Sequence, residues 1–314
     1  MDYPTSISKV LIVGAGWTGR QIAARMAQYG VDVWIRDRDS AVCDSAMQWI
    51  SQLSSEENGE VGHGELSNQE IATRSKTTTS TDGIASSGEH FSTRVQICDG
   101  SNSDAAELVL ECVPEQVSTK KRALRQLSEE FAAPTILASN SSYFVPSVLG
   151  QFVSDCSRFA HFHFHVPVLR TSVVDVSAHE ETVPEVVSLL RELTSRIGHE
   201  PLVLDREHPG YIFNWLLQSV LSASMHLSAK GVASPEMIDR SWTAVTGMPL
   251  GPFGIMDQIG LDVIEHVLHN SKWAPLDVAD TDQLLAIIRP MVEQGRLGTK
   301  TGAGFYNYED EAAS

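Results

Sequence analysis

The stretch VLIVGAGWTGRQIAARMAQYGVDVWIRD, residues 10–37, decides the fold of this 314-residue chain. An apolar run leads into a glycine-rich turn, and Ile22, Met26 and Tyr29 then follow at the spacing of one helix face. Gly30 is a natural helix terminator, and a second strand-like run comes directly after it. The stretch therefore predicts a strand, a turn, a helix and a second strand, which together are the repeating unit of a parallel sheet.

The turn carries a dinucleotide-binding fingerprint. Gly14, Gly16 and Gly19 form G-x-G-x-x-G between the strand and the helix, and Asp37 ends the next strand eighteen residues beyond Gly19. The first glycine permits a tight turn, the second lets a pyrophosphate approach the backbone, and the third lets the helix pack closely. A carboxylate at this point binds adenosine ribose hydroxyls and repels a 2′-phosphate, so the pattern predicts NAD as the cofactor rather than NADP.

The rest of the chain divides into two parts. Strand-like and helix-like patterns alternate up to about residue 208, and only helical patterns follow. We therefore expect an α/β fold, with a doubly wound, mostly parallel Rossmann-type sheet in residues 1–207 and an all-helical domain in residues 208–314. The further predicted strands are 95–98, 106–113, 135–140, 158–165, 171–177 and 200–205, and the predicted helices are 116–131, 184–197, 210–230, 235–246, 256–269 and 281–294.

A Ser/Thr/Gly-rich stretch interrupts the first domain at about residues 54–94. Twelve of the nineteen residues from Ser75 to Thr93 are Ser, Thr or Gly. Such a segment has little apolar surface to offset the entropy lost on ordering. The composition predicts a variable loop, and the alternative is a lid that orders over a bound ligand.

Charge and composition argue against several classes of protein. The net charge is −17, from 23 Lys and Arg against 40 Asp and Glu, which disfavours nucleic acid or an anionic membrane as a partner. The four cysteines lie far apart without C-x-x-C spacing, so neither a disulfide framework nor a zinc site is expected. The start of the chain lacks the pattern of a signal peptide, and no apolar run is as long as a membrane span. These features predict a cytoplasmic protein.

Three histidines alternate in RFAHFHFHVPVLRTSVVDV, residues 158–176. Alternation places His161, His163 and His165 on one face of a strand, where they could form a metal site, supply a catalytic base or simply fill space. Neighbours on one face of a strand are spaced by about 6.5–7 Å, whereas zinc needs each ligand at about 2 Å. We therefore predict no metal ion at this strand.

Seven segments together resemble the 3-hydroxyacyl-CoA dehydrogenase family. The resemblance covers the whole chain except roughly residues 50–100, and the order and spacing of the segments agree with the family pattern. The segments are VLIVGAGWTGRQIAARMAQYG, LVLECVPEQVSTKKRAL, ILASNSS, RFAHFHFHVPVLRTSVVDV, HPGYIFNWLL, GPFGIMDQIGLDV and GRLGTKTGAGFYNYE.

The resemblance assigns roles to individual residues. It implies that His163 is the catalytic base, that Asp175 replaces the family glutamate that orients it, and that Ser142 and Asn214 complete the catalytic site. An imidazole suits this role, because oxidation of a secondary alcohol needs a base near neutral pH while hydride leaves carbon. The cofactor-binding positions implied are Gly14, Gly16, Trp17, Thr18, Gly19, Asp37, Glu115, Lys120 and Asn140.

The resemblance implies an enzyme of fatty acid metabolism, whose activity is the NAD-dependent oxidation of an L-3-hydroxyacyl-CoA to the 3-oxoacyl-CoA. The family resemblance also implies a homodimer formed through the helical domain, with a small-molecule substrate.

Some positions depart from the family pattern. The family sequence FNP is replaced by His165, Val166 and Pro167, and residues 50–100 contain only Arg74, Lys76 and Arg94 as cations. CoA is strongly anionic and favours more positive charge. The alternative is therefore a dehydrogenase of a free 3-hydroxy acid such as L-gulonate or carnitine. A protein that binds NAD without catalysis is a third reading, which the retained catalytic residues disfavour.

Overall fold

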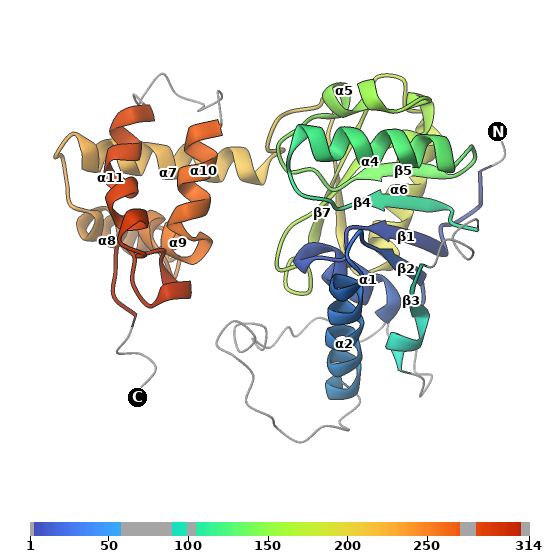
Figure 1. Ribbon diagram of the computed structural model, residues 1–314. Helices are drawn as coiled ribbons and strands as arrows, with labels where there is room; N and C mark the ends of the chain where they lie inside the picture. The colour runs from blue at the N-terminus through green and yellow to red at the C-terminus, as the bar shows by residue number, and fades with distance from the viewer. Residues whose placement is uncertain (1–2, 58–89, 99–104, 271–280, 309–314) are drawn as a thin grey trace. The chain divides into compact units, whose positions relative to one another are not determined.

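The computed structural model describes residues 3–57, 90–98, 105–270 and 281–308. It divides into two compact units, of which the first ends at Tyr211 and the second begins at Ile212 (Figure 1). The predicted boundary after residue 207 lies four residues earlier.

The N-terminal unit begins with the predicted strand, helix and strand. They are β1 (Lys9–Val13), α1 (Trp17–Gln28) and β2 (Asp32–Arg36), and β1 and β2 pair in parallel. Gly14 has a φ of 108°, and a Cβ there would lie 2.6 Å from the Cys112 carbonyl carbon. A Cβ at Gly19 would lie 1.9 Å from the Gly14 carbonyl oxygen, so α1 can begin this close to β1 only with glycine at both positions.

The sheet has the order β3-β2-β1-β4-β5-β6-β7-β8. All neighbouring strands pair in parallel except β6 and β7, which are antiparallel. The predicted doubly wound and mostly parallel sheet is therefore confirmed. The order reverses between β1 and β4, and ligands bind at the carboxyl ends of strands at such a switch point. The remaining strands are β3 (Val95–Ile97), β4 (Leu108–Glu111), β5 (Ile136–Ser139), β6 (Phe159–Phe164), β7 (Val173–Ala178) and β8 (Glu200–Val203).

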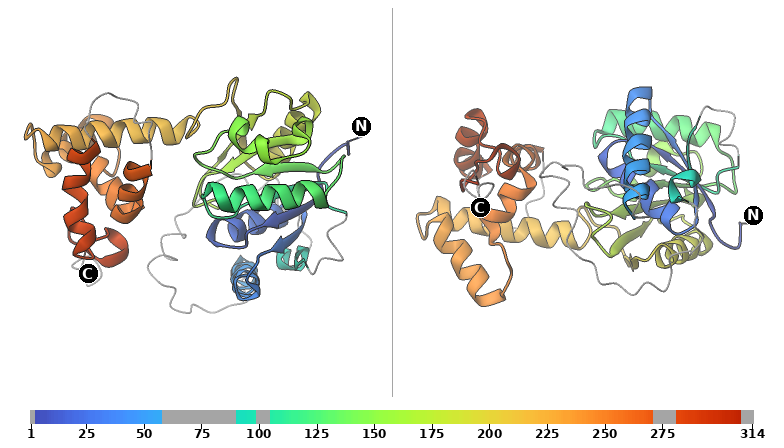
Figure 2. Two further views of the ribbon diagram at one scale, coloured as in Figure 1. Left: turned by 45° about the horizontal axis from the view of Figure 1, so that its top comes forward. Right: turned by 90° about the horizontal axis from the view of Figure 1, so that it is seen from below.

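Helices cover both faces of this sheet (Figure 2). On one face, α1, α2 (Ser40–Glu57) and α6 (Pro184–Arg196) bury side chains such as Ile22, Ile50 and Leu190 against the strands. On the other face, α4 (Val117–Glu130) and α5 (Pro146–Leu149) contribute Leu124, Leu127 and Leu149 to a separate core. The sheet is thereby buried on both sides, as a parallel sheet requires.

The predicted loop at about 54–94 overlaps two regular elements. Helix α2 continues to Glu57, and a 3-10 turn occupies Phe91–Arg94 directly before β3. Residues 58–89 lie outside the described residues. Neither the loop nor the lid interpretation of that part is therefore tested.

The second unit is helical, as predicted. Its helices are α7 (Phe213–Ala229), α8 (Pro235–Thr246), α9 (Pro252–Ile259), α10 (Leu261–Asn270) and α11 (Thr281–Glu293). The prediction of a single helix at 256–269 is wrong. Gly260 has a φ of 102°, which is outside the helical region, and it separates α9 from α10. Among the described residues, no helix combines the length and the apolar character that crossing a membrane requires.

Two buried carboxylates tie the helices of the second unit together. Asp239 of α8 accepts hydrogen bonds from the first-turn backbone N–H groups of Phe253 and Gly254, both at 2.8 Å, and so caps α9. Asp257 of α9 is fully buried and accepts from the N–H groups of Phe305 and Tyr306, each at 2.9 Å. The C-terminal segment is therefore fixed to α9 by charged hydrogen bonds.

Candidate active site

A cavity of about 580 Å³ lies at the switch point of the sheet. Its walls are the glycine turn, the carboxyl end of β2, the segment after β4 and one face of α4 from Thr119 to Leu127. A Cβ at Gly16 would meet no atom within 4 Å, so the space beside the start of α1 is open. Backbone N–H groups at the start of this helix favour a bound phosphate. The predicted residues that line this cavity are Gly14, Gly16, Trp17, Thr18 and Asp37, and Gly19 is buried in the first turn of α1.

Asp37 is fixed to the glycine turn. Its Oδ2 accepts a hydrogen bond from the Ala15 N–H at 3.0 Å, and its Oδ1 accepts from the Asp39 N–H at 3.2 Å. The neighbouring Arg36 forms a two-point ion pair with Glu130, with distances of 2.6 and 2.8 Å. The carboxylate therefore lines the cavity, while the guanidinium of Arg36 is bound to Glu130 of α4. That Asp37 binds the ribose hydroxyls remains a prediction.

His163 and Asp175 form a buried hydrogen-bonded pair. The antiparallel register of β6 and β7 places the two residues directly opposite each other. His163 Nδ1 lies 3.0 Å from Asp175 Oδ2, and the two residues are 3% and 0% exposed. Burial alone would raise the pKa of Asp175, but hydrogen bonds from His163 and His165 lower it below its ordinary value. Because an ionised carboxylate only accepts, the proton of neutral His163 is held on Nδ1.

The other ring nitrogen of His163 faces Ser142. Its Nε2 lies 3.1 Å from the hydroxyl oxygen of Ser142. Burial lowers the pKa of His163, and the hydrogen bond to Asp175 opposes this effect only in part. The imidazole is therefore neutral near pH 7, with its free lone pair beside a hydroxyl donor.

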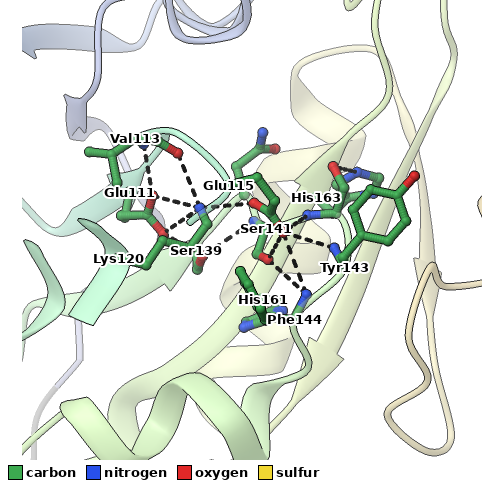
Figure 3. A network of polar contacts seen from close by, with 12 residues as sticks. Glu111, Val113, Glu115, Lys120, Ser139, Ser141, Tyr143, Phe144, His161 and His163 are labelled. Atoms are coloured by element: carbon green, nitrogen blue, oxygen red, sulfur yellow. Dashed lines mark hydrogen bonds and ion pairs between the residues drawn. The ribbon is translucent and has the colours of Figure 1, made fainter. Parts of the chain in front are cut away.

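The loop that carries Ser142 is held by one carboxylate (Figure 3). Glu115 Oε1 accepts from the Ser141 hydroxyl at 2.5 Å, from the Ser142 N–H at 3.1 Å and from the Tyr143 N–H at 2.9 Å. Glu115 follows β4, whereas the loop follows the neighbouring strand β5. Glu115 therefore fixes the position of Ser142 relative to the sheet.

Lys120 lies beneath this loop and is almost fully buried. Its ammonium contacts Glu111 Oε1 at 2.8 Å, Glu115 Oε2 at 3.2 Å and the Val113 carbonyl oxygen at 3.2 Å. Burial would lower the pKa of Lys120, but the two glutamates raise it, so the side chain stays charged. The predicted contact of Lys120 and Glu115 with the cofactor remains a prediction, because the contacts seen are with protein groups.

The two predicted asparagines have different positions. Asn140 follows β5, and its Oδ1 accepts a hydrogen bond from the Phe164 N–H at 2.8 Å, which links the ends of β5 and β6. Asn214 lies in the first turn of α7, in the second unit. The positions of the two units relative to one another are not determined, so a role for Asn214 beside His163 stays a prediction.

Tyr211 is a site residue that the sequence argument missed. Its ring stacks on the imidazole of His163, with centroids 4.4 Å apart and planes 8° from parallel. Its hydroxyl donates to the Ser141 carbonyl oxygen at 2.6 Å and lies 2.9 Å from His161 Nδ1. Burial raises the pKa of Tyr211, so the phenol keeps its proton. The available signal was the HPGY segment, in which a tyrosine replaces the phenylalanine of the family pattern.

His161 and His165 both form hydrogen bonds. His161 is fully buried, and burial lowers its pKa, so the ring is neutral. Because the Tyr211 hydroxyl donates its proton to Ser141, His161 Nδ1 is the donor to the Tyr211 oxygen. His165 Nε2 lies 2.8 Å from Asp175 Oδ2, the same oxygen that His163 contacts. The ligand-type atoms of His163, His165 and Asp175 lie within 4.8 Å of one another, but these hydrogen bonds account for the cluster. The predicted absence of a metal remains a prediction.

Both units match models of one family. The NAD-binding domain of 3-hydroxyacyl-CoA dehydrogenase matches residues 9–208, and the C-terminal domain of 3-hydroxyacyl-CoA dehydrogenase matches residues 210–308. The chain belongs to the 3-hydroxyacyl-CoA dehydrogenase family. It is therefore an NAD-dependent oxidoreductase of the 3-hydroxyacyl-CoA dehydrogenase type, and the cavity beside the glycine turn fits the cofactor of this family.

Relatives within the family differ in substrate. A probable 3-hydroxyacyl-CoA dehydrogenase of Caenorhabditis elegans is 28% identical over 312 residues, covering 97% of each chain. A 5-formyl-3-hydroxy-2-methylpyridine 4-carboxylate 5-dehydrogenase of Mesorhizobium japonicum is 27% identical over 310 residues, covering 97% of this chain and 92% of its own. The structure of a diketoreductase that acts on dicarbonyl compounds is similar with a TM-score of 0.80 at 30% identity, covering 97% of this chain and all of the other. Family membership therefore establishes the type of reaction and leaves the substrate open.

Proposed function

We propose that this protein catalyses the reversible, NAD-dependent oxidation of an L-3-hydroxyacyl-CoA to the 3-oxoacyl-CoA. The observation that carries the proposal is the buried pair of His163 and Asp175, with His163 Nε2 turned toward the Ser142 hydroxyl. These are the groups that removal of an alcohol proton requires. We place this activity in the cytoplasm, in fatty acid metabolism, with a homodimer as the functional form.

The proton steps follow from the hydrogen bonds. NAD supplies the hydride acceptor when it is bound. His163 Nε2 takes the proton of the substrate 3-hydroxyl, because its other nitrogen is already protonated and held by Asp175. The imidazolium that forms is stabilised by the ionised carboxylate of Asp175. In the reverse direction the same nitrogen returns the proton to the 3-oxo group.

Ser142 assists by holding the substrate oxygen. Its hydroxyl lies within hydrogen-bond distance of His163 Nε2, so a substrate hydroxyl beside this nitrogen also reaches Ser142 Oγ. Glu115 prevents the loop from moving away, since one of its oxygens accepts three hydrogen bonds from residues 141–143. We infer that Ser142 orients the substrate and that His163 performs the proton transfer.

The second candidate is a dehydrogenase of a free 3-hydroxy acid or a related small carbonyl compound. Lys120 is committed to a buried ion pair, and Arg94 pairs with Asp32 at 2.8 Å. Arg74 and Lys76 lie outside the described residues. Lys120 and Arg94 are therefore already paired with carboxylates of the chain, which leaves less of their charge for CoA phosphates. The pyridine carboxylate dehydrogenase and the diketoreductase among the relatives also favour a substrate without CoA.

One assay separates these candidates. NADH oxidation by the purified protein is measured with acetoacetyl-CoA, with free acetoacetate and with a dehydro sugar acid, and the variant His163→Ala serves as the control. We expect turnover with the thioester, lost by about 10²–10⁴-fold in the variant. Turnover with a free acid alone would favour the second candidate. Tight NADH binding without turnover on any of these compounds would leave a non-catalytic NAD-binding protein.

The proposed homodimer rests on the surface of the second unit. Helices α7 and α8 and the segments after them expose large apolar side chains, among them Leu216, Val232, Met237 and Val245, which are 59%, 66%, 63% and 84% exposed. Apolar surface of this kind is typical of a face that a second subunit covers. Light scattering after gel filtration tests this, and a mass of one chain at micromolar concentration would argue against the dimer.

A further inference from the structure

The carboxylate of Asp175 accepts two imidazole N–H groups on a single oxygen. Oδ2 lies 3.0 Å from His163 Nδ1 and 2.8 Å from His165 Nε2. Among the described residues, Oδ1 is buried without a hydrogen-bond partner. All hydrogen bonds that the structure shows for this carboxylate therefore converge on one atom.

The strand geometry produces this arrangement. His163 lies in β6 directly opposite Asp175, and His165 follows the last residue of β6 with the same parity. The two imidazole rings meet edge to face, with centroids 4.7 Å apart. His165 is 9% exposed, so little water competes for its hydrogen bond. A second imidazole thus lies against both members of the catalytic pair.

We propose, on the basis of the function proposed above, that His165 is a positioning residue, which shares the Asp175 carboxylate with His163 and thereby sets the protonation equilibrium of the catalytic base. His165 acts on the reaction through Asp175 and does not touch the reacting atoms. His165 reduces the stabilisation that the Asp175 carboxylate gives to a protonated His163, because one negative charge then accepts hydrogen bonds from two donors.

The surroundings of His163 make this effect large. Among the described residues, Asp175 is the only acidic side chain that forms a hydrogen bond with His163, and burial keeps water from replacing that partner. A protonated His165 would also repel a protonated His163 across the short distance between the rings. The titratable groups that face His163 are Asp175 from β7, His161 and His165 from the β6 segment, Glu115 from the segment after β4 and Tyr211 from the end of the first unit.

The sign of the effect follows from the role of His163. Oxidation needs the neutral imidazole, so the rate is full above the pKa of His163 and falls as the pH drops through it. Without the hydrogen bond from His165, Asp175 stabilises a protonated His163 more strongly, so the pKa of His163 rises. The half-maximal pH of the oxidation rate should then move upward, on the order of one pH unit.

Two variants distinguish the effect of the His165 hydrogen bond from the effect of the packing of its ring. His165→Phe keeps a planar ring of similar size without a donor, and His165→Gln keeps an N–H donor that does not ionise. Histidine-labelled NMR titration of the cofactor-free protein, with His163→Ala to identify the signal, measures the pKa of His163 in each. The pH profile of kcat/KM for oxidation measures the same equilibrium during turnover.

We expect the His163 titration to move upward in His165→Phe and to stay close to that of the unaltered protein in His165→Gln. An unchanged or lower His163 pKa in His165→Phe would overturn the inference. A shift seen by NMR in a protein that turns over no substrate would support the inference and count against the proposed function.

If His165→Phe does not fold, as judged by circular dichroism, the unaltered protein still decides the question. A carboxylate that serves two donors stabilises the protonated His163 less, so the titration of His163 should lie below the ordinary histidine pKa. A His163 pKa at or above the ordinary histidine value would refute the inference.

Discussion

Replacing Lys120 by methionine should destabilise the first unit strongly. Lys120 is 1% exposed, and Glu111, its closest partner at 2.8 Å, is fully buried. Removing one member of a buried ion pair costs about 3–5 kcal/mol, because the other charge stays buried without its partner. Glu111 keeps hydrogen bonds from the Val113 N–H at 2.7 Å and the Ser139 hydroxyl at 2.6 Å, so we expect the lower half of this range.

Thermal unfolding followed by circular dichroism measures this loss. For a unit of about 200 residues each 1 kcal/mol lowers Tm by about 2–4 °C, so Lys120→Met should lower Tm by roughly 6–16 °C. The adjacent Lys121→Met is the matched control, since Lys121 is half-buried beside Phe152 and should change Tm little. Adding Glu111→Gln to Lys120→Met should recover part of the loss, because no buried charge is then left unpaired. A Tm within 2 °C of the unaltered protein for Lys120→Met would refute the reasoning.

Four further predictions concern the site. Asp175→Asn should reduce kcat by about 10²–10⁴-fold, because the amide no longer fixes the His163 proton on Nδ1. Steady-state kinetics measure this loss, and an unchanged Kd for NADH shows that the variant still binds the cofactor. Burial lowers the pKa of His163, so kcat/KM for oxidation should stay constant down to a pH below the ordinary histidine pKa and then fall; a decline that begins above pH 7 would contradict this. Asp37→Ser should weaken NADH binding and narrow the preference over NADPH, and comparable turnover of the unaltered protein with both cofactors would disprove the role of this carboxylate. Treatment with EDTA should leave turnover unchanged, and elemental analysis that finds a bound transition metal in stoichiometric amount would require a different account of the three histidines.

Much of the fold was predictable because its signals are local. The glycine fingerprint, the helical spacing in α1 and the change to purely helical patterns after residue 208 each lie within a short stretch. The break at Gly260 was not predictable in this way, since Ile259 and Leu261 continue an apolar pattern that a single helix would also show. Only the positive φ of Gly260 in the folded chain reveals that two helices meet there.

The site was predictable in part. The family resemblance pointed to His163 and Asp175, and the structure shows the two side chains in contact. The resemblance did not show that Lys120 is buried. Its partner Glu111 lies nine residues earlier, on a strand, and only the packing of α4 on the sheet brings the two side chains together. The second hydrogen bond of Asp175 likewise depends on the register of β6 and β7, which the sequence does not specify residue by residue.

The stacking of Tyr211 on His163 has a consequence for how the His163 imidazole is held. Tyr211 is the last residue of the first unit, its φ of 53° is unusual for a residue other than glycine, and its hydroxyl is bound to the loop of Ser142. The chain thus leaves the first unit from a ring that lies flat on His163, the proposed catalytic base. A change in the backbone torsions of Tyr211 would tilt that ring, so the last residue of the first unit is also part of the support that holds the imidazole in place.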